Sequence, residues 1–400
     1  MLNVVSFDEA IRITKNEFSF FDPGTEILSI TECTGRVTAK DIVSRENIPP
    51  FDRSTVDGYA VLSSDTFGAS EGIPSMLSVK GEILMGEEAK GFIRSGECIK
   101  ISTGGMLPAG ADSVVMVEYT EKMIDETCLI FKAVSPFQNV TKAGDDVKTG
   151  QKIISKGTLL TSKHVGILCA LGINEVECVR KIKVGIISSG DEIVPVQKDI
   201  PFGKIRDINS HFLSALMKEK GCDALEYGIV KDNIDELYDT LQKAADECDV
   251  IMISGGSSAG NKDMTCDVIE KNGKVYYHGI AVKPGKPTIF GKLNNKAVFG
   301  LPGHPAAAYL IAKTVVTELI RFFSGETGKD FTLTAEITES ISSNHGREEL
   351  VPVIFENGKA QPLFFKSGLV SLLSTADGYI IVPRNKEGLL KNETVTVHLF

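Results

Sequence analysis

Hydrophobic and polar positions alternate with a different period in successive parts of the chain. The spacing S-x-x-E at residues 6–9 is typical of a helix start, and apolar residues then recur at helical spacing as far as Phe18. Residues 51–135 instead contain short apolar runs separated by Gly, Ser and Pro, which predicts a small all-β domain. A short helix is predicted at 161–171, where a glycine follows.

From residue 181 the apolar pattern is that of buried strands alternating with helices. Strands are predicted at 183–188, 225–230 and 249–254 and near 274, 288 and 297, and helices at about 210–220, 233–247, 265–271 and 305–323. This alternation predicts a doubly wound, largely parallel α/β domain. Ligands of such domains bind at the carboxyl ends of the strands.

After residue 325 the pattern contains strands only, so a small β-barrel or sandwich of about 70 residues is expected. Its predicted strands are 331–341, 350–355, 359–365, 379–383 and 394–400. The fold class expected for the whole chain is therefore multidomain, α/β plus β.

The composition of the chain disfavours several classes of protein. The 400 residues are 42% hydrophobic and 24% charged, as in a folded multidomain protein. A net charge of -10 disfavours nucleic acid and anionic membranes as partners, and no apolar run is long enough for a membrane span. The start of the chain does not resemble a secretory signal, so a cytoplasmic location is expected. Eight dispersed cysteines without a C-x-x-C pair indicate reduced core thiols, not disulfides or zinc ligands.

Three polar loops are predicted at the carboxyl ends of strands, at 188–192, 204–209 and 254–263. Their glycines allow backbone N–H groups to approach an anion, and their acidic residues suit Mg²⁺ held beside a phosphate. One such loop alone would be interpreted as an ordinary turn. Three at the same edge favour a phosphate site.

Two stiff loops complete the candidate site. Residues 283–287 (KPGKP) present Lys283 and Lys286 from a proline-framed glycine turn, and lysine suits a tetrahedral oxyanion. The alternative is that both lysines are solvated surface residues. Residues 300–305 (GLPGHP) place His304 directly before a helix. No dinucleotide fingerprint, NTPase P-loop or H-x-x-x-H zinc pair is present.

Together with three further segments, the loops at 188–192, 254–263, 283–287 and 300–305 resemble the molybdopterin molybdenumtransferase family, known as MoeA in bacteria and as the gephyrin E domain in animals. The further segments are 49–61 (PPFDRSTVDGYAV), 101–112 (ISTGGMLPAGAD) and 143–146 (AGDD). Each motif is short, but seven in family order are highly specific, and they span nearly the whole chain.

The resemblance implies four domains and a homodimer. The domains are a discontinuous linking domain (1–50 and 137–180), an inserted β domain (51–136), a doubly wound domain like that of MogA (181–325) and a C-terminal β-barrel (326–400). The implied active cleft lies between the doubly wound domain of one subunit and the inserted domain of the other.

The implied reaction inserts molybdate into adenylylated molybdopterin and releases AMP, with Mg²⁺ as cofactor. The resemblance assigns catalytic roles to Asp57, Thr103, Asp146, Glu192 and Asp263, of which Asp57, Glu192 and Asp263 would bind the metal. It assigns substrate binding to Ser189, Gly190, Asp207, Asn209, Gly255, Gly256, Ser258, Lys283, Lys286, Pro302, His304, Pro305, Arg347 and Ser367. It also suggests the molybdopterin adenylyltransferase and other cofactor-biosynthesis proteins as candidate partners.

Departures from the family pattern leave alternatives open. His304 stands where the family usually has Asn, and Ala307 removes a serine hydroxyl, so the choice between molybdate and tungstate is not decided. One rival function is an adenylyltransferase that makes adenylylated molybdopterin. The other is a non-enzymatic scaffold, as the animal homologues also bind receptor tails.

Overall fold

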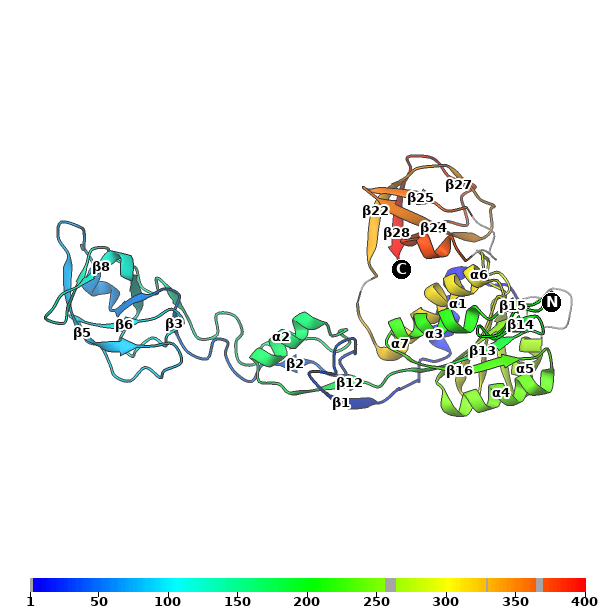
Figure 1. Ribbon diagram of the computed structural model, residues 1–400, viewed down its shortest axis with the longest axis horizontal. Coiled ribbons are helices and arrows are strands. Elements are labelled where there is room, and N and C mark those ends of the chain that lie inside the picture. The colour runs from blue at the N-terminus through cyan, green and yellow to red at the C-terminus, as the bar shows by residue number, and fades with distance from the viewer. Residues whose placement is uncertain (1–2, 256–263, 329, 365–369) are drawn as a thin grey trace. The chain divides into compact units, whose positions relative to one another are not determined.

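The computed structural model describes residues 3–255, 264–328, 330–364 and 370–400. The chain forms two compact units (Figure 1). Unit 1 comprises Met1–Ala39, Gly157–Thr161 and Val176–Phe400, and unit 2 comprises Lys40–Lys156 and Ser162–Glu175. The boundaries expected between four domains remain a prediction.

The main sheet of unit 1 has six strands in the order β16-β13-β17-β21-β20-β18. Four neighbouring strands are parallel, as predicted: β16 (Asp223–Val230), β13 (Lys183–Ser189), β17 (Val250–Gly255) and β21 (Lys296–Leu301). The other two, β20 (Ile289–Leu293) and β18 (Gly273–His278), form an antiparallel edge. The reason is a two-residue hairpin at Asn294 and Asn295, which both have positive φ and reverse the chain directly into β21.

Helices cover both faces of this sheet (Figure 1). On one face lie α4 (Ile234–Glu247) and α5 (Met264–Asn272); on the other lie α1 (Phe7–Asn16), α3 (Asn209–Glu219), α6 (Pro305–Ile311) and α7 (Thr317–Ser324). Sheet residues alternate between the two cores, with Val184 and Ile186 on one side and Ile187 on the other. The predicted caps are present, because Ser6 accepts from the N–H of Glu9 and Asn233 from the N–H groups of Asp235 and Glu236.

The helix predicted at 305–323 is interrupted by a π-turn, Ala312–Val316, between α6 and α7. Two threonine hydroxyls bond to main-chain carbonyls here: Thr314 Oγ1 donates to Leu310 O (2.7 Å) and Thr317 Oγ1 to Lys313 O (2.5 Å). Such side-chain bonds compete with the regular helical ladder. Gly325, with φ of 63°, then ends α7.

The C-terminal strands of unit 1 form a closed barrel, which confirms the predicted fold class. Its strands follow the order β24-β25-β22-β28-β26, and β26 pairs back with β24. Their bounds are β22 (Thr332–Ile337), β24 (Glu348–Glu356), β25 (Lys359–Pro362), β26 (Gly378–Val382) and β28 (Thr394–Leu399). A short strand that precedes the barrel in sequence, β19 (Val282–Lys283), also pairs with β24.

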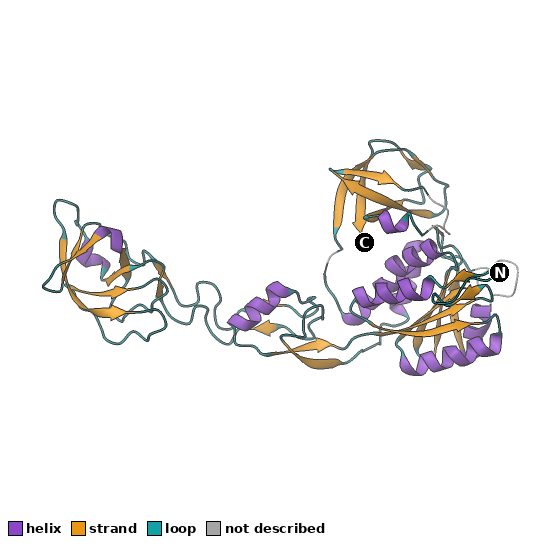
Figure 2. Cartoon of the chain, in the orientation of Figure 1, coloured by secondary structure: helices purple, strands orange, loops and turns teal. Residues whose placement is uncertain are grey.

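Strands are the main regular elements of unit 2, joined by long loops (Figure 2). Its six-stranded sheet, in the order β7-β4-β6-β5-β9-β8, confirms the all-β character predicted for this part of the chain. The strands are β4 (Gly58–Val61), β5 (Ser75–Ile83), β6 (Glu97–Ile101), β7 (Ser113–Met116), β8 (Thr120–Lys122) and β9 (Thr127–Ile130). The predicted short helix is α2 (Ser162–Ala170).

Short pairs of strands complete the two units. They are β1 (Thr25–Ser29) with β12 (Glu175–Val179), β2 (Ile42–Val43) with β11 (Lys152–Ile154), β3 (Arg53–Ser54) with β10 (Val140–Thr141), β14 (Ile193–Val194) with β15 (Ile205–Arg206), and β23 (Ile341–Ser342) with β27 (Gly388–Leu389).

Among the described residues no two cysteines form a disulfide; six of the eight are buried, Cys169 is exposed and Cys266 is half-buried. Within the described residues, every helix is too short or too polar to cross a membrane.

Candidate functional site

The parallel strands β13, β17 and β21 end side by side at one edge of the main sheet. Ser189 lies opposite Gly255 across β13 and β17, and Ser254 lies opposite Leu301 across β17 and β21. A Cβ atom on Gly255 would lie 1.9 Å from the carbonyl oxygen of Ser189, so this close approach requires glycine. The predicted loops after β13 and β17 therefore begin at the same edge. Gly256, Ser258 and Asp263, which belong to the second loop, lie outside the described residues.

Asn209, the first residue of α3, ties this edge together. Its Nδ2 donates to Ser254 Oγ (2.6 Å) and to the carbonyl oxygen of Gly303 (2.9 Å). Its Oδ1 and the Oγ of Ser189 are buried and have no hydrogen-bond partner among the described residues. Buried polar atoms are normally hydrogen-bonded, so these two atoms are available to a ligand or to water.

Asp207 is held inside the protein. Only 5% of the residue is exposed, and its carboxylate accepts hydrogen bonds from Ser188 Oγ (2.9 Å) and from Ser210 N (3.1 Å) and Oγ (2.7 Å). These bonds fix the start of α3 beneath the strand ends. Asp207 thus positions the helix that carries Asn209. The contact of Asp207 with the substrate remains a prediction.

Glu192 supplies an exposed carboxylate at the same edge. Gly190 has φ of 153°, and the Glu192 carboxylate folds over it, 2.8 Å from where a Cβ on Gly190 would lie. Lys204 braces the turn, because its Nζ donates to the carbonyl oxygen of Asp191 (2.5 Å). Carboxylate oxygens suit Mg²⁺, but no group of three His, Cys, Asp or Glu side chains with metal-binding geometry occurs in the described part of the chain.

Five of the predicted substrate residues line one cavity of about 590 Å³ in unit 1, called here the oxyanion cavity. They come from three segments far apart in sequence: Lys283, Lys286, Pro302, His304 and Arg347. Ser367, also predicted for this site, lies outside the described residues. Ala307 lines the cavity and is 2% exposed, so the missing serine hydroxyl is a real difference in the wall.

The loop that carries the two lysines is fixed by its surroundings. Strand β19 pairs in parallel with β24, with Val282 opposite Glu348 and Lys283 opposite Glu349, and the Lys283–Pro284 peptide is cis. Gly285 has φ of 119°, and a Cβ there would lie 2.5 Å from Ile311 Cδ1. The hydroxyl of Thr288 donates to the carbonyl oxygen of Gly285 (2.6 Å). The loop is therefore a packed part of the fold.

Glu349 is a charged residue of this cavity that the sequence analysis missed. Lys283 Nζ lies 2.5 Å from Glu349 Oε1, and Ser343 Oγ donates to Glu349 Oε2 (2.7 Å). The Glu349 side chain is only 12% exposed, whereas that of Lys283 is 47% exposed. Lys283 therefore faces the cavity with its charge largely balanced, and the net positive charge comes from Lys286 and Arg347.

Pro305 occupies the first position of α6, as predicted, and its neighbours Ala306 and Ala307 are buried. The N–H group at this position has no partner within a helix, so proline, which lacks it, costs no hydrogen bond there. The short loop before it holds His304 and Pro302 in the wall of the oxyanion cavity.

In unit 2 the structure brings Asp57 and Thr103 together. Both are exposed, and the Asp57 carboxylate accepts from the main-chain N–H of Thr103 (2.7 Å). Asp146 is also exposed, and its main-chain N–H donates to the carbonyl oxygen of Ile48 (3.0 Å), which anchors the backbone of this segment. The catalytic roles of Asp57, Thr103 and Asp146 remain predictions.

Comparisons with known proteins extend over nearly the whole chain. Three family models match in succession: "MoeA N-terminal region (domain I and II)" at residues 5–172, "Probable molybdopterin binding domain" at 185–321 and "MoeA C-terminal region (domain IV)" at 334–400. A molybdopterin molybdenumtransferase of Haemophilus influenzae is 34% identical over 388 residues, which are 95% of this chain and 95% of that protein. One of Bacillus subtilis is 31% identical over 385 residues, 94% of this chain and 90% of that protein.

Solved structures of MoeA proteins also match nearly the whole chain. A molybdopterin biosynthesis MoeA protein from Pyrococcus horikoshii matches with a TM-score of 0.87 and 39% identity, over 99% of both chains. A second structure of a MoeA protein from Pyrococcus horikoshii matches with a TM-score of 0.88 and 32% identity, over 99% of this chain and 100% of that one.

Proposed function

Since this chain belongs to the MoeA family, whose curated members are named molybdopterin molybdenumtransferases, we propose that it is a transferase of molybdenum cofactor biosynthesis that inserts molybdate into molybdopterin. We further propose that the substrate is adenylylated molybdopterin, that AMP is released, and that the reaction requires Mg²⁺. The observation that carries the proposal is the oxyanion cavity, where Lys283, Lys286 and Arg347 meet.

The oxyanion cavity has positive charge that suits molybdate. Molybdate is a small tetrahedral dianion, and Lys286 and Arg347 supply positive charge that Glu349 does not balance. The stiff loops around Pro302 and Gly285 would hold these groups in place before the ligand arrives, which lowers the entropic cost of binding.

The strand-end edge would bind the adenylylated pterin. Gly255 lets the backbone approach a phosphate closely, and the unpartnered Ser189 Oγ and Asn209 Oδ1 offer hydrogen bonds at the same edge. His304 and Pro302 follow β21, which ends at this edge, and also line the oxyanion cavity, so the two ligands would lie near one another.

Mg²⁺ fits the chemistry of the residues at this edge. We propose that the exposed carboxylate of Glu192 would hold it together with Asp263 and with Asp57 of a second subunit, in a homodimer. When bound, Mg²⁺ supplies positive charge that stabilises the cleavage of a phosphate anhydride. The chain's own residues would orient the anhydride, through Gly190 and Gly255, and keep molybdate beside it.

The test is a turnover assay on the purified full chain. Adenylylated molybdopterin and MgCl₂ are supplied with or without molybdate, and AMP is measured by chromatography. We expect AMP release that depends on molybdate and stops when Mg²⁺ is chelated. A parallel series with tungstate decides the oxyanion preference.

The same assay separates the rival functions. If the chain instead forms adenylylated molybdopterin from ATP and molybdopterin, it is an adenylyltransferase. If neither reaction occurs, while a MoeA protein assayed under the same conditions is active, the chain is a non-enzymatic scaffold. Either result would overturn the proposal.

A further inference from the structure

A second cavity of unit 1, of about 780 Å³, shares no lining residue with the oxyanion cavity. Its walls include the C-terminal end of α3, the π-turn and α7, and strands β26 and β28 of the barrel. Lys218, Lys220 and Lys313 line it, together with the aromatic side chains of Tyr379 and Phe400. It is called here the lysine cavity.

These three lysines form no ion pair with any residue in the described part of the chain. None of them has a carboxylate within ion-pair distance among the residues that the structure describes. Lys218 and Lys220 lie at the end of α3, and Lys313 extends from the π-turn toward Lys220. Burial, and then the neighbouring Lys220, lower the pKa of Lys313 to about 8. The half-buried ammonium group of Lys313 therefore lies beside that of the exposed Lys220, which disfavours its charge.

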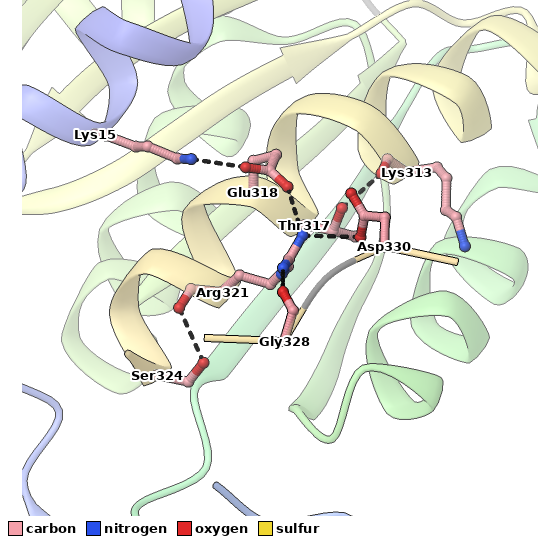
Figure 3. A network of polar contacts seen from close by, with 8 residues as sticks. All are labelled: Lys15, Lys313, Thr317, Glu318, Arg321, Ser324, Gly328 and Asp330. Carbon is pink, nitrogen blue, oxygen red and sulfur yellow. Dashed lines mark hydrogen bonds and ion pairs between the residues drawn. The ribbon is translucent and has the colours of Figure 1, made fainter. Parts of the chain in front are cut away.

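Among the carboxylates that line the cavity, Glu318 and Asp330 are engaged with other cations, whereas Glu32, Glu219 and Glu326 form no ion pair within the described residues. Arg321 Nη1 lies 3.1 Å from Glu318 Oε1 and 2.8 Å from Asp330 Oδ1, and Arg321 also donates to the carbonyl oxygen of Gly328. Lys15 Nζ contacts Glu318 Oε2 at 2.6 Å. Figure 3 shows this network, with the ammonium group of Lys313 pointing away from it. The network holds α7 and the entry to the barrel together. Glu219 and Asp330 favour the charge of Lys313, but less than burial and Lys220 disfavour it.

An apolar surface lies beside the lysines. Lys313 Nζ is 5.8 Å from the centre of the Phe400 ring, and the rings of Phe400 and Tyr379 are 5.8 Å apart. Tyr379 also stacks on His398 at 5.1 Å. The cavity thus combines cations that form no ion pair within the described residues with aromatic walls, and its volume is in the range of small-molecule sites.

The local backbone also differs from that of a regular helix. Lys313 lies inside the π-turn, and turns of this kind are rare and frequently occur at functional sites. The hydroxyls of Thr314 and Thr317 bond to the main chain around it.

We propose that the lysine cavity binds an organic anion, whose phosphate or carboxylate group is held by Lys313 and Lys220 and whose apolar part packs against Tyr379 and Phe400. This ligand is separate from the substrates of the proposed reaction, so the inference stands or falls independently of that function.

The test is calorimetric titration of the full chain at pH 7 with phenyl phosphate, benzoate and inorganic phosphate. We expect phenyl phosphate to bind with one site per chain and more tightly than inorganic phosphate, because only it contacts the aromatic wall. Benzoate distinguishes the source of the charge: tighter binding of phenyl phosphate assigns a phosphate ligand, and tighter binding of benzoate a carboxylate ligand.

Matched lysine variants locate the site. Lys313→Gln and Lys220→Gln should each weaken binding about tenfold or more, since a charge-assisted hydrogen bond contributes on the order of a factor of ten. Lys220 is exposed, so its substitution is compatible with folding even if Lys313→Gln is not. Lys359→Gln, an exposed change on β25, should have no effect. Lys283→Gln, in the oxyanion cavity, should leave this binding intact.

The dependence on pH supplies a second readout. Lys313 carries its charge below about pH 8 and loses it above, so binding should weaken about tenfold from pH 7 to pH 9. Lys313→Gln should remove this pH dependence, whereas Lys359→Gln should retain it. The other titratable or charged groups that act on Lys313 or line the cavity are Glu32, Arg36, Lys181, Lys218, Glu219, Lys220, Glu318, Arg321, Glu326, Asp330, Tyr379 and His398.

Two results would overturn the inference. One is binding that persists in both Lys313→Gln and Lys220→Gln but is lost in Lys283→Gln, which would assign the anion to the oxyanion cavity. The other is the absence of any saturable binding of phenyl phosphate and benzoate by the folded wild-type chain at pH 7.

Discussion

Lys283 enters the oxyanion cavity as half of an ion pair, and this changes what its substitution should do. Its Nζ is 2.5 Å from Glu349, whose side chain is mostly buried. Removing the lysine would leave a mostly buried carboxylate without its ion-pair partner, facing the position proposed for a dianion. By contrast, no ion pair of Lys286 occurs among the described residues, so its loss removes one positive charge and exposes no negative one.

We therefore expect Lys283→Gln to raise the molybdate concentration for half-maximal AMP release more than Lys286→Gln does. Each change should cost a factor of about ten or more, because one charge-assisted contact is lost. The double variant Lys283→Gln, Glu349→Gln should recover part of the loss, as a double-mutant cycle would show. If half-saturation by molybdate is unchanged in both single variants, the two lysines are solvated surface residues.

A second prediction at the scale of residues concerns the stability of the fold at low pH. The hydrogen bond and charge of Arg36 lower the pKa of Glu26 below its ordinary value of 4.5. Because the pKa of this carboxyl is lower in the folded state, the ionised group stabilises the fold at pH values above its ordinary pKa. This contribution is lost as the pH falls through the lowered pKa. The Glu26 side chain is 41% exposed, so the contribution is expected to be under about 1 kcal/mol.

Urea unfolding of the wild type and of Glu26→Gln should check this expectation. The variant should be less stable at pH 7, and the difference should be smaller at pH 4, below the ordinary pKa of a glutamate. Glu175→Gln, an exposed change on β12, is the matched control and should match the wild type at both values. A difference that is constant with pH would remove the ion pair as the cause.

Secondary-structure elements could be predicted where one local signal decides them. The caps at Ser6 and Asn233 and the buried runs of β13 and β17 are of this kind. The antiparallel edge of the main sheet was not foreseen, because its direction depends on the positive φ of two asparagines, Asn294 and Asn295. The π-turn was also missed, since the apolar spacing of residues 305–323 is compatible with one continuous helix.

The end of β17 offers a test at the scale of elements. A Cβ on Gly255 would collide with the carbonyl oxygen of Ser189 at 1.9 Å, so Gly255→Ala should force β13 and β17 apart. We expect it to lower the melting temperature and to reduce AMP release more than tenfold. Gly203→Ala is the control, because Gly203 also has positive φ, 82°, but has open space around it.

The control should lose only about 1–2 kcal/mol for the left-handed backbone, with activity retained. Equal effects of the two substitutions would mean that the close approach of the strands has no importance for the site.

At the scale of the whole molecule, the candidate site depends on contacts that sequence patterns do not encode. Lys283 and His304 could be chosen from motifs and Arg347 from the family resemblance, and the fold brings all three to one cavity. Glu349 could not be chosen from a motif. Its contact with Lys283 joins two residues that are 66 positions apart, and it depends on the parallel pairing of β19 and β24. Pairing between strands from different parts of a chain is set by the fold and leaves no periodic signal.

Oligomeric state is the prediction that belongs to this scale. The proposed site needs Glu192 of one subunit and Asp57 of another, so we expect a dimer at micromolar concentration, with twice the 43.2 kDa mass of the chain. Light scattering coupled to gel filtration measures this mass, and the AMP assay on the same fraction measures activity. A fully active monomer would rule out a site shared between subunits.

The two-residue strand β19 also limits how the length of the chain can vary among relatives. Val282 and Lys283 are held opposite Glu348 and Glu349, and successive side chains of a strand point to opposite faces. An insertion or deletion of one residue close to either segment would turn Lys283 away from Glu349. Length changes in this family are therefore expected to spare both segments and to accumulate in exposed loops such as 195–203, where no such register has to be kept.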